Sequence, residues 1–256
     1  MLSLFTPFDP AIDVSDLPLK FTYPFDYEPH ALSIIAVRIL QEYLKNQKVW
    51  QHNFGLQEGH DGKVIGKMFG ILLVKTAKKE IGFLSAFSGK LADSNLHEGF
   101  VPPVYDALET GSFLNVGMQE LTELNRQLNF LEHDSEAARV LKQERKKKSA
   151  GLQAKLFDQY YFLNNEGVRK SLKSIFTEER NQKPPSAAGE CAAPKLLQYA
   201  FQHQLTPIAM AEFWWGESPK SDQWKHKHFY PACIEKCQPI LRHMLAGMEI
   251  EPKPNR

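Results

Sequence analysis

The stretch HFYPACIEKCQPIL, residues 228–241, holds two of the three cysteines of this chain. Cys233 and Cys237 are four residues apart, and Cys191 lies well upstream, at the expected start of a helix. Zinc takes thiolate or imidazole ligands at about 2.0–2.3 Å, often a close pair on one element plus one or two from elsewhere. The three cysteines therefore favour a zinc site, with His228 or His226 as the fourth ligand. The alternative left open is three ordinary buried cysteines.

The composition predicts a globular chain with a sizeable core. Of its 256 residues 43% are hydrophobic, and the formal net charge is +1. The longest apolar run, MFGILLV at 68–74, is too short to cross a bilayer, and the N-terminal segment has no basic start. We therefore expect a cytoplasmic protein with no membrane partner, whose cysteines are thiols or metal ligands and not disulfides.

The apolar patterns on either side of Cys191 predict the core elements. From His30 the apolar residues recur at helical spacing, and KMFGILLVKT (67–76) with EIGFLSAFSG (80–89) suits a β-hairpin. Cys191 begins a helix, LTPIAMAEFWWGESP (205–219) reads as a strand, and PILRHMLAGM (239–248) closes the chain as a helix.

Leucines at helical spacing fill the region between these two halves. They continue without proline through residues 119–163, which predicts two long antiparallel helices or one broken coiled coil. We therefore expect three segments: 1–118 with the arm, first helix and hairpin, 119–183 as the helical insertion, and 184–256 as the second half of the core.

The order helix, β-hairpin, helix, strand, helix resembles the core of zinc-dependent nucleobase deaminases. The resemblance implies an α+β fold with a three-layer, deaminase-like core interrupted by a long α-helical hairpin or coiled coil. That family places a glutamate two residues after its first ligand, where this chain has Ala193. Glu190 and Glu212 are the nearby carboxylates that could replace it as general acid/base.

A basic run occupies the middle of the predicted helical insertion. Within ARVLKQERKKKSAG (138–151), Glu144 is the single acidic residue. Uncompensated lysine and arginine gain affinity for a polyanion by releasing counterions, so one interpretation is a phosphate-binding surface; the other is a solvated helix. The candidate nucleic-acid-binding residues are Arg139, Lys142, Arg145, Lys146, Lys147 and Lys148.

Several long strings resemble the region upstream of the catalytic domain in large bacterial RluA-type pseudouridine synthases. They run in order through nearly the whole chain: FTYPFDYEPH, GKMFGILLV, IGFLSAFSGKL, FVPPVYD, AGECAAPKLLQYAF, PIAMAEFWWGESPK and HFYPACIEKCQPILRHML. The resemblance implies uridine isomerisation in RNA by an aspartate in an R-L-D motif. No RLD occurs in this sequence, so no catalytic residue carries over, and the synthase domain would be a linked or separate partner.

Three functions follow as hypotheses. The first is a non-catalytic module that binds structured RNA, ribosomal or transfer, in support of a pseudouridine synthase, with zinc holding the core. The second is a zinc-dependent deaminase with an unconventional acid. The third is an interaction module that associates with itself or with another chain through the coiled coil.

Overall fold

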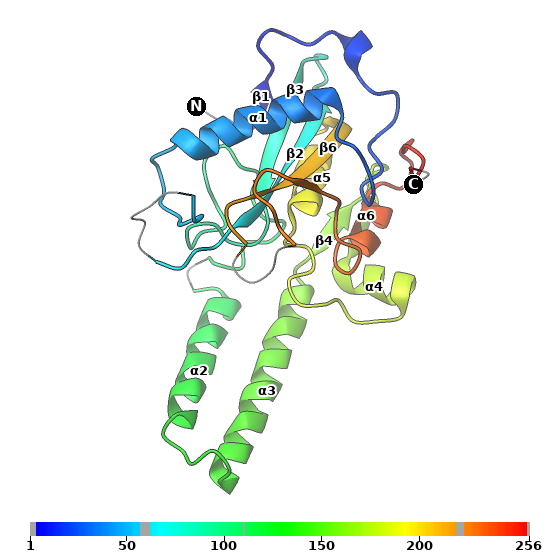
Figure 1. Ribbon diagram of the computed structural model, residues 1–256. Helices are drawn as coiled ribbons and strands as arrows, with labels where there is room; N and C mark the ends of the chain where they lie inside the picture. Colours follow the sequence, from blue (N-terminus) through cyan, green and yellow to red (C-terminus); the bar gives the residue numbers. More distant parts are fainter. Residues whose placement is uncertain (1–3, 57–61, 110, 219–222, 255–256) are drawn as a thin grey trace.

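The computed structural model describes residues 4–56, 62–109, 111–218 and 223–254, and within them the chain is α+β (Figure 1). A sheet of five strands lies at the centre, and a pair of helices projects from it. The elements, in chain order, are β1 (Thr6–Pro7), α1 (Ala31–Asn46), β2 (Lys67–Lys75), β3 (Ile81–Phe87), α2 (Phe113–Leu128), α3 (Glu136–Phe157), β4 (Tyr161–Leu163), β5 (Arg169–Ser171), α4 (Leu172–Arg180), α5 (Ala192–Gln202), β6 (Thr206–Trp215), β7 (Phe229–Tyr230) and α6 (Gln238–Met244).

The central sheet is antiparallel throughout, in the order β1-β3-β2-β6-β7. The predicted hairpin is confirmed: β2 and β3 pair along their length. In the turn that joins them, the Thr76 N–H donates to the Glu80 carbonyl and the Thr76 carbonyl accepts from the Lys79 N–H, both at 2.9 Å. β6 pairs with β2 on the side away from β3, so a strand from the last third of the chain completes the sheet.

The strand residues alternate between two cores. Ile71 and Leu73 of β2 face one side, which α1 covers, whereas Leu72 and Val74 face the other, which α5 and α6 cover. All four are fully buried. This alternation follows from the two-residue period of a strand. Figure 1 shows α1 and α5 on opposite sides of the sheet.

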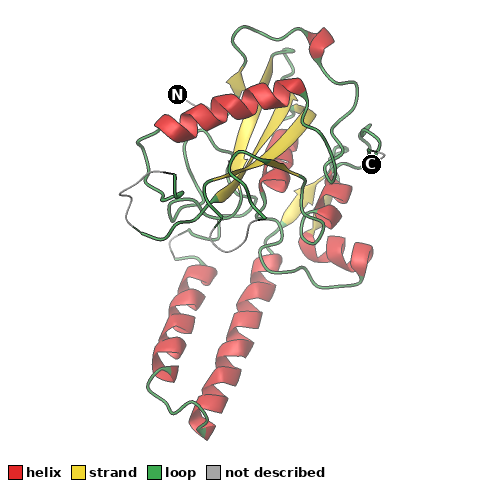
Figure 2. Cartoon of the chain, viewed as in Figure 1, coloured by secondary structure: helices red, strands yellow, loops and turns green. Residues whose placement is uncertain are grey.

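The projecting pair consists of α2 and α3 (Figure 2). Each helix begins with a serine cap, in which the hydroxyl oxygen of Ser112 or Ser135 accepts from the backbone N–H three residues on. Gly117 of α2 faces Leu152 of α3, and a Cβ at position 117 would lie within 2.3 Å of the Leu152 side chain. The two helices thus pack closely where glycine leaves room.

The predicted deaminase-like core with a long inserted helical hairpin or coiled coil is wrong. The two helices are 16 and 22 residues long. The first, α2, begins at Phe113, before the predicted start at residue 119, and the second, α3, ends at Phe157, well before the predicted end at residue 183. The rest of the predicted insertion forms a two-stranded sheet, β4–β5, and the nine-residue α4.

The physical reason for this error lies at Tyr160 and Leu163. Both continue the helical spacing, but Tyr160 is buried in the core on the α5 side, and Leu163 ends the extended strand β4, next to the fully buried Phe162. Tertiary burial overrides the local pattern there. None of the described helices combines the length and apolar character needed to cross a membrane.

Candidate metal centre and basic helix

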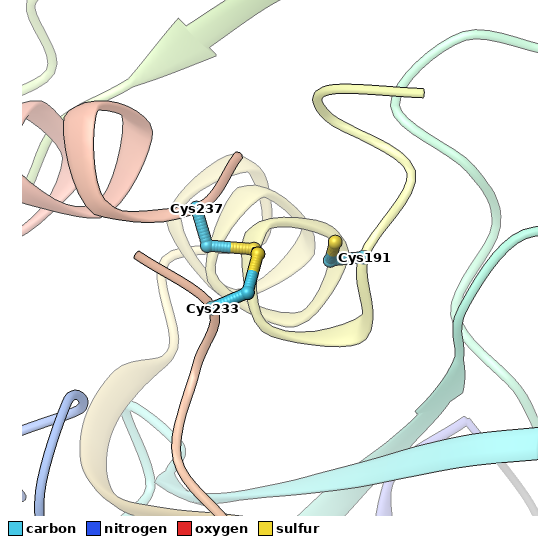
Figure 3. Close-up of side chains that lie close together, drawn as sticks. All are labelled: Cys191, Cys233 and Cys237. Carbon is cyan, nitrogen blue, oxygen red and sulfur yellow. The ribbon is translucent and has the colours of Figure 1, made fainter. Parts of the chain in front are cut away.

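The three cysteines meet where α5 and α6 begin. Cys191 is the N-cap of α5 and Cys237 the N-cap of α6, while Cys233 precedes α6 in a turn closed by the Cys237 N–H on the Cys233 carbonyl at 3.2 Å. All three Sγ atoms lie within 4.8 Å of one another, and those of Cys233 and Cys237 are 3.4 Å apart (Figure 3). The predicted convergence of the cysteines is therefore present.

Close packing of α5 on the sheet positions Cys191. Gly70 of β2 lies beneath the first turn of α5, and a Cβ at this position would be 3.0 Å from the Cβ of Ala192. Real Cβ atoms rarely come this close, so glycine allows the helix start to approach the strand. The Ser88 hydroxyl also accepts from the Ala192 N–H at 3.2 Å.

An arginine holds the turn that carries Cys233. The guanidinium of Arg180, the last residue of α4, donates to the carbonyl of Ile234 at 2.6 Å and to the Gln238 side chain at 3.0 Å. These contacts tie the cysteine turn to a separate helix. The positions of Cys233 and Cys237 therefore depend on α4 as well as on their own turn.

The electrostatics favour one thiolate among the three sulfurs. Hydrogen bonds from Cys191 and then Cys237 hold the pKa of the Cys233 thiol well below its usual value. The pKa values of Cys191 and Cys237 are raised, because each thiol is held protonated by its hydrogen bond to a neighbouring sulfur. A metal bound by all three sulfurs would displace the two remaining protons.

Three sulfurs in this arrangement fit a soft metal ion. Tetrahedral zinc with bonds of about 2.3 Å places its sulfurs roughly 3.8 Å apart, which lies within the spread observed here. The three cysteines could therefore hold a metal ion.

The predicted fourth ligand does not join this group. Neither His228 nor His226 belongs to the cluster found among the described residues. The Nδ1 atom of His228 lies 3.2 Å from the His226 carbonyl, and the Nδ1 atom of His226 accepts from the Gly216 N–H at 3.1 Å. In the described part of the chain, the cluster thus offers a metal ion three protein ligands.

Of the two candidate carboxylates, Glu212 is the one buried beside the centre. It projects from β6 toward α5, is 4% exposed, and accepts from the Ala193 N–H at 3.3 Å. Burial, and then the negative charge at Cys233, raise the pKa of Glu212 to about 8, an effect that the Ala193 hydrogen bond partly offsets. Glu190 is half-buried, and its backbone carbonyl accepts from the Gly89 N–H.

Sequence reasoning missed two groups near the centre, a buried lysine in α5 and a half-buried tyrosine in the N-terminal arm. Lys195, one turn after Cys191, is 3% exposed and donates to the Phe87 carbonyl at 2.9 Å. Burial lowers the pKa of Lys195 to about 8. The hydroxyl of Tyr27 donates to the Tyr230 carbonyl and accepts from the Glu212 N–H, which links the N-terminal arm to β6 and β7. The only signal in the sequence was for Lys195, which stands on an otherwise apolar face of the predicted helix.

The basic run lies along α3 and not at the tip of the helical pair. Seven of the 22 residues of α3 are Lys or Arg and two are Glu. Lys148 pairs with Glu120 of α2 at 2.7 Å, so this residue is less available than predicted. Lys142 donates to the His133 carbonyl at 3.0 Å. The exposed candidates with no ion pair among the described residues are Arg139, Lys142, Arg145, Lys146 and Lys147.

A separate cavity lies on the α1 side of the sheet. Its volume is about 740 Å³, and its lining includes Trp50, His52, Trp215 and Lys227. None of the cysteines lines it. The metal centre and this cavity are thus different places in the fold.

Comparisons of the chain with family models, with curated proteins and with solved structures give no significant match. The resemblance to the accessory region of RluA-type synthases therefore stays a prediction from the sequence.

Proposed function

We propose that this chain is a non-catalytic RNA-binding module whose core is stabilised by zinc at Cys191, Cys233 and Cys237. The observation that carries the RNA-binding part is the set of exposed lysine and arginine residues of α3 that form no ion pair within the described part of the chain. The resemblance of the sequence to the accessory region of RluA-type synthases supports a role in presenting structured RNA for uridine isomerisation by a partner domain.

The form of the helical pair supports contact with a nucleic acid. A helix of 22 residues is about 33 Å long, enough to follow several phosphates along a strand or groove. Close packing at Gly117 and the Lys148–Glu120 ion pair hold α3 against α2. Because the pair projects from the core, its basic helix is open to a large polyanion (Figure 2).

The salt dependence of RNA affinity follows from the number of basic side chains on α3 that contact phosphates. Five phosphate contacts give a slope of log affinity against log salt of roughly −3.5 to −4.5. Affinity would then fall on the order of 100-fold or more between about 50 and 200 mM salt. A solvated helix with no polyanion partner gives no such dependence.

The experiment compares RNA binding by the wild type and by two matched triple variants. Binding of a structured RNA, such as transfer RNA, is followed by fluorescence anisotropy over a salt series. The variant R145Q/K146Q/K147Q removes three charges from α3. The variant K20Q/K78Q/K90Q removes three charges from exposed lysines outside the helical pair.

The α3 variant should bind at least tenfold more weakly with a shallower salt slope, while the core variant should resemble the wild type. Equal loss in both variants would indicate non-specific charge attraction. Salt-independent binding, or none, would contradict an RNA-binding role and favour an interaction module.

The zinc part of the proposal rests on three thiols brought together from α5 and from the turn before α6. Such a site links two segments that are distant in sequence, so metal binding would contribute to folding. Removing one thiol, as in Cys237→Ser, should therefore lower both zinc content and thermal stability.

A further inference from the structure

We infer that the metal centre is an open one, in which a zinc ion held by Cys191, Cys233 and Cys237 keeps a fourth coordination position for a neutral nitrogen or oxygen base from solution. This inference rests on the proposed zinc site and goes beyond its structural role. It concerns what else the ion binds.

The count of protein donors leaves the fourth position to an outside ligand. Structural zinc sites are closed by four protein ligands, whereas a site with three retains a place for a solution ligand. In the described part of the chain, the group of possible ligands consists of the three cysteines alone. The two nearby histidines, His226 and His228, have an Nδ1 atom engaged with backbone groups elsewhere.

The position of Cys233 makes the centre reachable. Cys233 is exposed, Cys191 is half-buried and Cys237 is buried, so the sulfur cluster lies at the edge of the core and not deep inside it. Because Cys233 is exposed, its side of the cluster is the one from which a small ligand would reach the metal.

Glu212 gives the centre a polar neighbour that is not a ligand. One carboxyl oxygen is held by the Ala193 N–H, two residues after Cys191. Among the described residues Glu212 forms no ion pair, although burial of an unpaired carboxyl is costly. The charge at Cys233 acts on this carboxyl group, which places it beside the cluster. A carboxyl group there would hydrogen-bond a ligand on the metal, and such outer contacts tune what a metal binds.

The charge of the centre selects the class of ligand. Zinc with three thiolates carries a net charge of −1, and the carboxyl group of Glu212 adds no positive charge. Anions are therefore repelled, whereas neutral donors such as water, imidazole or an amine are not. The centre should prefer imidazole to azide at equal concentration.

Cobalt substitution tests this inference directly, because tetrahedral Co²⁺ bound to thiolates has visible absorption bands that respond to the fourth ligand. The full chain is loaded with Co²⁺ and titrated with imidazole and, separately, with azide. We expect the ligand-field bands to shift in a saturable way with imidazole while the sulfur-to-cobalt absorption and the cobalt content stay constant. Azide should cause no shift over the same range.

The outcomes separate the two proposals. If the chain binds no cobalt or zinc, both the zinc site and the open position are wrong. If cobalt binds but the bands do not respond to imidazole, or if imidazole strips the metal, the open position alone is wrong. In Glu212→Gln, the affinity for imidazole should change about tenfold with unchanged cobalt content, and an unchanged affinity would remove Glu212 from the inference.

Discussion

Replacement of Lys195 by methionine tests how the core beside the metal centre is built. The ammonium group of Lys195 is held on the Phe87 carbonyl at 2.9 Å, and it lies 5.1 Å from the centre of the Phe87 ring. Burial is the main cause that lowers its pKa from 10.5 to about 8. Methionine keeps much of the side-chain length but has no charge, so the variant isolates the effect of this proton.

The sign of the pH effect follows from the depressed pKa. Between pH 8 and 10.5 the unfolded chain keeps the Lys195 proton while the folded chain has lost it, so the free energy of unfolding of the wild type rises with pH. The full shift corresponds to about 3.4 kcal/mol. By pH 10 the wild type should have gained about 2.5 kcal/mol relative to its value at pH 7. Lys195→Met lacks this gain.

Urea unfolding followed by circular dichroism at pH 7, 8, 9 and 10 measures the difference between the wild type and Lys195→Met. Groups that titrate in both proteins cancel in that difference. Lys45→Met, at an exposed lysine of α1, serves as the control and should show no such trend. A difference between the wild type and Lys195→Met that stays constant within about 0.5 kcal/mol over this range would refute the reasoning.

Three further substitutions test the packing that positions the site. Gly70→Val should push the start of α5 from the sheet, cost about 1–3 kcal/mol of stability and weaken metal binding in a chelator competition; unchanged metal affinity would show that the close approach does not position the first thiol. Gly117→Ala should lower the thermal midpoint because its methyl group meets Leu152, whereas Gly151→Ala, which meets nothing within 4 Å, should raise stability by about 0.5–1 kcal/mol. A reversed order would contradict the close packing of α2 on α3. Arg180→Ala should release the cysteine turn and reduce metal affinity several-fold with the thermal midpoint of the metal-free protein little changed, and an equal loss of both would indicate a purely structural role.

The convergence of the three cysteines could be predicted because each one stands next to a recognisable helix start. Pro194 and Pro239 mark first turns, and the apolar spacing after them indicates two helices that must cover one sheet. The hairpin of β2 and β3 was predictable for a similar local reason. The short connection after Lys75 leaves no other arrangement for two adjacent strands.

The segment after α3 could not be predicted in this way. Tyr160 and Leu163 continue a helical spacing, and only the core on the α5 side, which buries Tyr160 and Phe162, explains why the chain is extended there. The burial of Lys195 could not be predicted from the sequence either, since the carbonyl that accepts its hydrogen bond belongs to Phe87, 108 residues earlier in the chain. Contacts of such long range leave no local pattern.

Distance along the chain is a poor guide to membership of the sulfur cluster. His228 lies five residues before Cys233, with β7 between them, and it is not among the clustered ligands of the described chain. Glu212, by contrast, is distant in sequence and close in the fold, since its strand pairs with β2 directly under α5.

Zinc content of the purified chain is the most direct test of a metal centre built by α5 and the turn before α6. Elemental analysis of protein prepared without chelator should find about one zinc per chain, and Cys237→Ser should contain less than about 0.2. Less than about 0.2 equivalents in the wild type, with no fall in thermal midpoint after chelation, would contradict the account.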